Sequence, residues 1–185
     1  MHIELGNRRV VILVGLSLVF GVAGFFYANR FLRAQTHGPI ADDYTWHWLA
    51  GKAVIEGKDP YETVTPGGPH QLNAGYLYPM PAAIVATPFS FFTPITAASV
   101  FCGVSVAVLV FGIGLTGCGR LPMLAGVPFL WAAAAGQMSL LSTGAALVPG
   151  LGWPYLLSFT SATKGISAGP NPQNWSITLP LVDAP

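Results

Sequence analysis

A run of 21 residues without a charged side chain, from Ile95 to Leu115, limits what this chain can fold into. At about 1.5 Å per residue, a helix of this length crosses the ~30 Å apolar layer of a bilayer. A second apolar run of 19 residues, Val10 to Ala28, follows Arg8 and Arg9. A cleavable signal peptide also begins in this way, but the run has no convincing small-residue cleavage site, so we interpret it as a retained first helix. The two runs predict an all-α, polytopic membrane protein.

The composition agrees with this class. Only 8% of the 185 residues are charged, against about 25% in an average soluble domain. The net charge of +1 comes without a basic patch that would neutralise phosphates, so we expect no nucleic-acid partner. No spacing of His, Cys and Glu suggests a metal site. Cys102 and Cys118 are 16 residues apart, or ~24 Å along one helix, so we expect small buried side chains and no disulfide within that helix.

Three shorter apolar stretches predict further spans at about residues 121–135, 139–151 and 153–164. With the spans at about 10–28 and 95–115, a transmembrane module would cover residues 1–164, and residues 165–185 would form an irregular tail. Arg8 and Arg9 favour a cytoplasmic N-terminus by the positive-inside rule. The loop over about 29–94 would then be extracytoplasmic, in a multi-pass protein of the cell (inner) membrane.

This polar loop contains a predicted interfacial helix. Asp42 or Asp43 can cap a helix that runs to about Glu56 and ends at Gly57. Its apolar residues recur at helical spacing, and its tryptophans, Trp46 and Trp48, are typical of a membrane interface. Stacking of a sugar on these rings is the alternative. The face consists of Trp46, Leu49, Ala50, Ala53 and Val54.

Two further segments complete the loop. Residues 57–61 predict a turn, and the Pro- and Gly-rich residues 65–75 predict an irregular loop. The apolar stretch that begins at Tyr78 is interrupted by Pro88 and Pro94, so we expect a short interfacial or re-entrant helix there.

The order of motifs in this arrangement resembles the polyprenyl-phosphate-sugar-dependent glycosyltransferases of the GT-C fold, and most closely the bacterial mannosyltransferase type called glycosyltransferase family 87. The family's first-loop motif, Asp-Phe-x-x-Tyr-x-x-Ala, corresponds to Asp43, Tyr44, His47 and Ala50, where Tyr44 and His47 replace the phenylalanine and the tyrosine of the motif. Members of the family are considerably longer, so the resemblance implies an incomplete GT-C bundle, an N-terminal fragment or a truncated relative. The other matching elements are Gly57-x-Asp59-Pro60-Tyr61, Tyr78-Pro79-Met80-Pro81 and Gly136-Gln137. Lys164-Gly165 stands where the family has Lys-Pro, without the proline.

The resemblance implies a sugar, mannose in the first instance, carried from a polyprenyl-phosphate donor to a glycan or glycolipid acceptor in the membrane, and we expect no cofactor. Asp42 and Asp43 could hold a divalent ion, but two adjacent residues alone do not indicate one, so we expect no metal site. Asp43 would be the general base, because an inverting transfer needs a carboxylate within reach of the acceptor hydroxyl. Asp42 could replace it or bind the acceptor. The residues implied to bind the donor are His47, Tyr61, Tyr78, Gln137, Lys164 and Arg33.

Other interpretations remain open at this stage. Asp42 and Asp43 could simply cap their helix. The chain could be a non-catalytic, truncated membrane protein or a subunit of another function. A piece of a transporter or channel would place charges inside its spanning helices, and neither long apolar run contains one.

Overall fold

The computed structural model describes residues 7–34, 42–67, 72, 75–78 and 80–151, and these residues are mainly helical. The described ranges contain no strand, only an isolated bridge between Gly67 and Leu72. The prediction of an all-α chain is therefore confirmed for this part. The helices are α1 (Asn7–Ala34), α2 (Asp42–Ile55), α3 (Pro60–Thr63), α4 (Met80–Ala86), η1 (Thr87–Phe89), α5 (Pro94–Thr116), η2 (Cys118–Ala125), α6 (Val127–Ala135) and α7 (Met138–Leu147).

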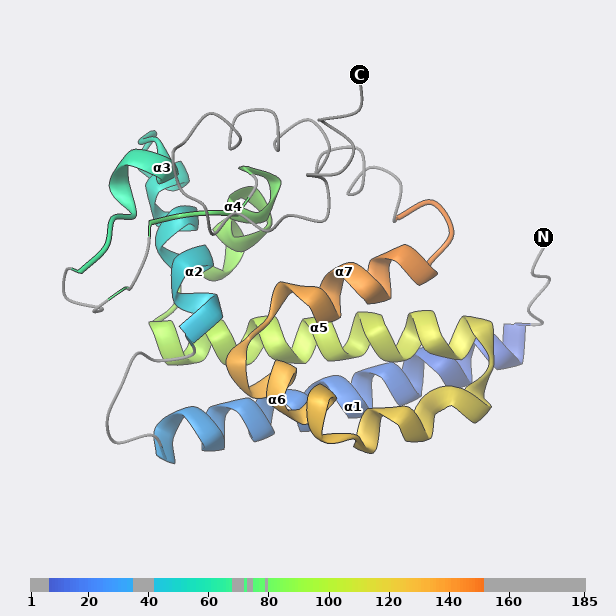
Figure 1. The fold of residues 1–185 in the computed structure, drawn as a ribbon. Helices are drawn as coiled ribbons and strands as arrows, with labels where there is room; N and C mark the ends of the chain where they lie inside the picture. Colours follow the sequence, from blue (N-terminus) through green and yellow to red (C-terminus); the bar gives the residue numbers. More distant parts are fainter. Residues whose placement is uncertain (1–6, 35–41, 68–71, 73–74, 79, 152–185) are drawn as a thin grey trace, which may run out of the picture.

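The helices α1 and α5 lie side by side and antiparallel, and both are long and apolar enough to cross a membrane (Figure 1). Leu13 near the start of α1 packs at Gly114 near the end of α5. At the middle of the pair the backbones approach so closely that a Cβ on Gly21 would lie 2.9 Å from the carbonyl oxygen of Gly103. Close approach through small residues is typical of helices packed in a membrane.

The outer surface of α1 is apolar and exposed, which is the surface that a lipid-facing helix presents. By contrast, α5 is largely buried by its neighbours and forms the centre of the fold. These observations are consistent with the predicted membrane protein. The exposed apolar side chains of α1 include Val11, Ile12, Leu18, Val19, Val22 and Phe26.

The prediction for the ends of these two helices was right for α5 and too short for α1. Helix α5 begins and ends within one residue of the apolar run 95–115. Helix α1 continues past the predicted end at Ala28 to Ala34, through Arg30 and Arg33. Arginine is a good helix former, and a cation in the last turn interacts favourably with the helix dipole. The change from apolar to polar residues therefore marks the end of the apolar surface, not the end of the helix.

The stretch predicted to span at about 121–135 is helical but bent. The chain there forms η2 and α6, which meet at Gly126 with a bend of 72°. Pro122 and Pro128 each lack a backbone N–H donor, and Gly126 itself is extended, so the helical hydrogen bonds are interrupted. The structure thus has two helices that could cross a membrane, or up to three if the bent pair counts as one.

Helix α7 covers Met138–Leu147, so it is shorter than the stretch predicted at 139–151. Its 10 residues extend ~15 Å, which is about half of the apolar layer. It packs along α5. The span predicted at 153–164 and the tail at 165–185 lie outside the described residues.

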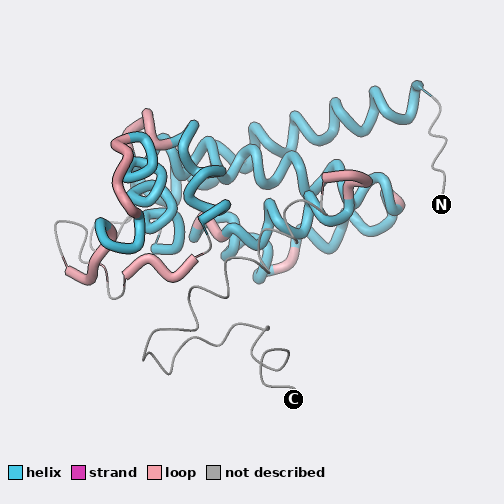
Figure 2. The backbone as a smooth tube through the Cα atoms, turned by 90° about the horizontal axis from the view of Figure 1, so that it is seen from above, coloured by secondary structure: helices cyan, strands magenta, loops and turns pink. Residues whose placement is uncertain are grey.

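Helices α2, α3 and α4 gather at one end of the α1–α5 pair (Figures 1 and 2). Helix α2 has the predicted extent, and Gly57 ends it with a left-handed φ of 68°. The short apolar stretch after Tyr78 forms α4 and η1, in agreement with the prediction that it is too short to span.

Trp48 was predicted to be an interface anchor, and this prediction was wrong. Its side chain is only 6% exposed, and its indole Nε1 donates to the carbonyl oxygen of Phe92 at 3.1 Å. Ser90 also bonds to this residue, since its Oγ donates to the carbonyl oxygen of Trp48 at 3.0 Å. Helix α2 is therefore packed against protein on several sides. Trp46 is half-buried.

Candidate functional site

The first turn of α2 contains the predicted base Asp43 and its neighbour Asp42. Their carboxylates lie outside the part of the chain that the structure describes. The next residue, Tyr44, is 1% exposed, and its ring stacks on Phe101 of α5 with 4.6 Å between ring centroids. On its other side, a Cβ on Gly136 would lie 2.7 Å from the Cβ of Tyr44. The start of α2 is thus held between α5 and the junction of α6 with α7.

His47 lies one turn further along α2 and is completely buried, with 0% of its side chain exposed. Its ring centroid lies 4.2 Å from that of Tyr78 and 6.1 Å from that of Tyr76, which meets it edge-on. Burial penalises the charged form and lowers the pKa of His47 from 6.5 to about 4. The imidazole is therefore neutral at physiological pH.

A neutral imidazole has one N–H donor and one nitrogen acceptor. Neither ring nitrogen of His47 has a hydrogen-bond partner among the described residues, and neither does the hydroxyl of Tyr44. Burial also raises the pKa of Tyr44, so its hydroxyl keeps its proton. Buried polar atoms of this kind are uncommon in proteins, and they are expected where a ligand or water completes the site.

The Gly57-x-Asp59-Pro60-Tyr61 element forms a helix start. Asp59 is the N-cap of α3, and its Oδ1 accepts from the backbone N–H of Tyr61 at 2.8 Å. Pro60 occupies the first helical position, where a missing N–H costs nothing. Tyr61 is 37% exposed, and its hydroxyl donates to the carbonyl oxygen of Tyr78 at 2.9 Å. The predicted turn is present at Gly57, and from Pro60 the chain continues as a short capped helix.

Burial is the main cause that raises the pKa of Tyr61, and the charge of Asp59 adds to it. Its hydroxyl therefore keeps its proton for the bond to Tyr78. Tyr61, Tyr76 and Tyr78 form a ring cluster, with 5.5 Å between the centroids of Tyr61 and Tyr76 and 5.8 Å between those of Tyr76 and Tyr78. We call the rings of Tyr44, His47, Tyr61, Tyr76 and Tyr78 the aromatic cluster.

Three of the predicted donor-binding residues, His47, Tyr61 and Tyr78, thus come together. Tyr76 belongs to none of the sequence motifs, and its alternation with Tyr78 on an extended segment was the available signal. Gln137 directly follows Gly136, and its Oε1 accepts from the Ser139 hydroxyl at 3.3 Å. It therefore begins α7 near the start of α2.

The other predicted donor-binding residues are not part of this cluster. Arg33 is exposed in the last turn of α1, and its Nε donates to Asn29 Oδ1 at 2.9 Å. The amide of Asn29 in turn donates to Ser99 of α5 at 3.2 Å, so the guanidinium is tied to the α1–α5 pair. Lys164 lies outside the described residues.

Metal-ligating side chains do not gather in the described part of the chain: it holds no group of three or more His, Cys, Asp or Glu that could bind an ion. Both cysteines are free. Cys102 is buried in α5, as predicted, whereas Cys118 is exposed, contrary to prediction, because α5 ends before it at Thr116.

Comparison of the chain with protein-family models, with curated proteins and with solved structures found no match. The class of this protein is therefore described from its fold and its candidate site. The chain is a helical protein with apolar helices of membrane-spanning length, and at one end of the α1–α5 pair it holds an aromatic cluster around a neutral histidine.

Proposed function

We propose that this chain is a membrane glycosyltransferase, or a piece of one, that transfers a sugar from a polyprenyl-phosphate donor to an extracytoplasmic glycan or glycolipid acceptor. The sugar would be mannose, and Asp43 would be the general base. The proposal rests on the motifs described above together with the way in which their residues meet. Polyprenyl phosphate would be the leaving group, and we propose no cofactor.

The contacts among four separate motifs are the observation that carries this proposal. His47 of the first-loop motif contacts Tyr78, and Tyr61 hydrogen-bonds the Tyr78 carbonyl oxygen. Gly136 of the Gly-Gln motif contacts Tyr44. Segments far apart in the sequence thus converge on the first two turns of α2. Residues that take part in one reaction must lie close together, and a rigid helix such as α2 holds them in place.

In the proposed reaction, the acceptor hydroxyl oxygen attacks the anomeric carbon of the donor sugar. The bond between this carbon and the phosphate oxygen breaks, and its electron pair leaves with the polyprenyl phosphate. The proton of the acceptor hydroxyl passes to the carboxylate of Asp43. A positioned general base contributes about 10²- to 10⁴-fold to such a step.

His47 would serve as a neutral hydrogen-bond donor to the sugar or to the phosphate. Its lowered pKa favours this role, since a neutral imidazole donates without adding a buried charge. Because the imidazole is completely buried, a ligand would reach it only after surrounding side chains had moved. Arg33, Gln137 and Lys164 are proposed to contact the donor phosphate from the surrounding segments.

The test compares Asp43→Asn with Asp42→Asn in membranes that contain the full chain. The membranes receive polyprenyl-phosphate mannose with a labelled sugar, and the label in glycans and glycolipids is measured. We expect Asp43→Asn to lower the transfer rate at least 100-fold and Asp42→Asn to lower it much less, with equal amounts of membrane-inserted protein. Full transfer by Asp43→Asn with a loss in Asp42→Asn would assign the base to Asp42.

The second candidate function is that of a non-catalytic membrane protein or subunit. It is favoured by the complete burial of His47, which also suits a purely structural core residue. On this alternative, neither aspartate variant changes any transfer of label, and wild-type membranes transfer no more than membranes without the chain.

A further inference from the structure

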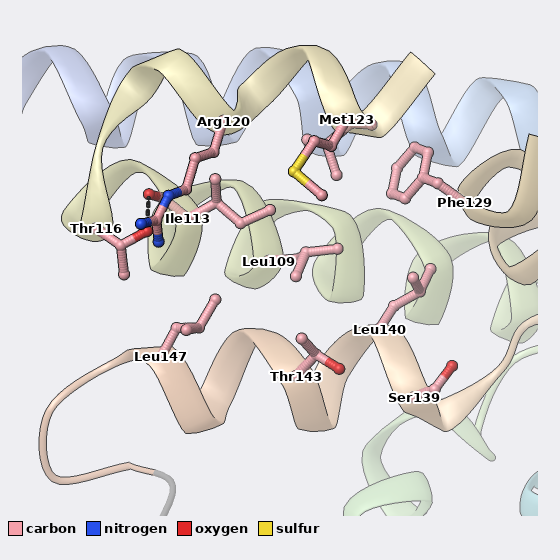
Figure 3. A pocket seen from close by; sticks show the side chains of 11 residues that line it. Leu109, Ile113, Thr116, Arg120, Met123, Phe129, Ser139, Leu140, Thr143 and Leu147 are labelled. Atoms are coloured by element: carbon pink, nitrogen blue, oxygen red, sulfur yellow. Dashed lines mark hydrogen bonds between the residues drawn. The ribbon is translucent and has the colours of Figure 1, made fainter. Parts of the chain in front are cut away.

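A groove runs along α5 at the end of the α1–α5 pair that lies away from α2, α3 and α4. Its volume is about 330 Å³, within the range of small-molecule sites. Leu109 and Ile113 of α5 form its floor, while η2 and α7 form its two walls (Figure 3). Leu147 and Arg120 lie at the end near Thr116.

The groove offers little to a polar ligand. Most of its lining consists of leucine, isoleucine, methionine and phenylalanine side chains. The hydroxyl of Thr116 already donates to the Ile113 carbonyl oxygen at 2.8 Å, and that of Ser139 donates to Gln137 at 3.3 Å. A water molecule needs two to four polar partners to be held. Hydrocarbon is therefore the better occupant, and the groove lies beside a helix long enough to cross a lipid bilayer.

The charges at this end of the fold indicate an anionic head group. Among the residues that line the groove, only Arg120 is charged. It forms no salt bridge with any of the described residues. The antiparallel contact of Leu13 with Gly114 brings Arg8 and Arg9 to the same end. The acidic residues of the described ranges all lie in segment 42–62, at the opposite end. Basic pockets between membrane helices bind anionic lipid head groups.

We propose that this groove holds one acyl chain of an anionic phospholipid, whose phosphate lies at the guanidinium of Arg120. From Ser139 to Leu147 the α7 wall extends ~12 Å, enough for the upper part of an acyl chain, while the rest continues into the bilayer. The proposal does not depend on glycosyl transfer, because the head-group end of the groove, at Thr116 and Arg120, lies at the opposite end of α5 from the aromatic cluster (Figure 1).

The first test measures lipid preference. The purified full chain in mixed micelles is given phosphatidylglycerol and phosphatidylcholine with the same acyl chains, and bound lipids are counted by native mass spectrometry. We expect Arg120→Gln to weaken phosphatidylglycerol binding about fivefold, with little change for phosphatidylcholine. Arg9→Gln is the matched control, because it removes a cation from the same end but does not line the groove. An equal loss of phosphatidylglycerol binding in both variants would overturn the proposal, since it would indicate a general attraction of the anionic lipid to the basic end of the fold.

A second variant tests the groove itself. Thr143 is exposed and lines the groove, so Thr143→Phe fills it without removing a buried contact. We expect this variant to lose both lipids while its helical circular dichroism stays unchanged. Unchanged lipid binding by Thr143→Phe contradicts the proposal.

The identity of the occupant is tested by photo-cross-linking in native membranes. With p-benzoylphenylalanine in place of Thr143, we expect an adduct with the mass of a phospholipid. A cross-link to another segment of the same chain, or to a second copy, identifies a protein occupant and overturns the proposal.

Discussion

Gly136 and Tyr44 are in direct contact, such that a Cβ on Gly136 would lie 2.7 Å from the Cβ of Tyr44. Gly136 also has a left-handed φ of 67°, which side-chain-bearing residues rarely adopt. The contact joins the Gly-Gln element to the helix that begins with Asp42 and Asp43. Both the space and the backbone conformation at this position therefore require glycine.

The variant Gly136→Ala should accordingly destabilise the protein by about 1–3 kcal/mol, through backbone strain and the clash with Tyr44. The measurement is unfolding of the purified protein by sodium dodecyl sulphate in mixed micelles. Gly119→Ala is the control, because a Cβ there would meet no atom within 4 Å. Equal unfolding midpoints for the two variants would show that the contact is not maintained.

The packing of α7 on α5 should depend on Gly144 in the same way. A Cβ on Gly144 would lie 2.6 Å from the backbone nitrogen of Leu109, and backbone atoms cannot move aside as a flexible side chain can. We expect Gly144→Ala to cost about 1–3 kcal/mol in the same unfolding measurement. Gly15→Ala in α1 should be neutral or stabilising, since its Cβ meets no atom within 4 Å and alanine favours the helix.

The stability of the protein should fall in mild acid because of His47. The unfolded histidine has a pKa near 6.5, and the folded one about 4, so between these values the unfolded state binds more protons. The free energy of unfolding therefore decreases as the pH falls from about 6.5 to about 4. The difference between the two pKa values corresponds to an upper limit of ~3 kcal/mol.

The control for this pH dependence is His47→Phe, which keeps an aromatic ring at the position and removes the titrating group. The three other histidines, His2, His37 and His70, are present in both proteins. We expect the mutant to lose most of the dependence between pH 6.5 and 4 in thermal unfolding. A mutant with the same pH dependence as the wild type would refute the assignment to His47.

The cap of α3 gives a local prediction. Asp59→Ala removes the acceptor for the Tyr61 amide, and loss of a helix N-cap costs about 1 kcal/mol. Amide hydrogen exchange of Tyr61 should accelerate about fivefold, with little effect on α5. Asp59→Asn retains an acceptor oxygen and should exchange nearly as the wild type does. Similar exchange in both variants would mean that the carboxylate, rather than the cap, holds the turn.

Several elements were predictable because their causes are local. The run 95–115 contains no charge, no proline and enough residues to cross a bilayer, and α5 follows it closely. The limits of α2 agree with its acidic start and with Gly57, whose left-handed φ ends the helix. Pro88 and Pro94 also explain why the stretch after Tyr78 stays short. The same kind of residue, at 122, 126 and 128, bends the stretch 121–135.

The candidate site was predictable only in part. The motifs include His47, Tyr61 and Tyr78, and the structure brings these three together. Tyr76 lies in no motif but joins them, and Arg33 lies apart. The burial of individual side chains was the property that the sequence predicted least well. Trp48 has the residue type of an interface anchor, and only the packing of η1 and the following loop against α2 reveals it as a core residue.

Apolar length, charge distribution and turn residues are properties of short stretches, and for that reason the amino-acid order alone was sufficient for the all-α class and for α2 and α5. The state of His47 is a property of several stretches at once. Its imidazole is neutral because α2 and the segment of Tyr76 and Tyr78 together exclude water from it. Such a desolvated environment exists only after distant segments have packed, and so only the tertiary structure decides it.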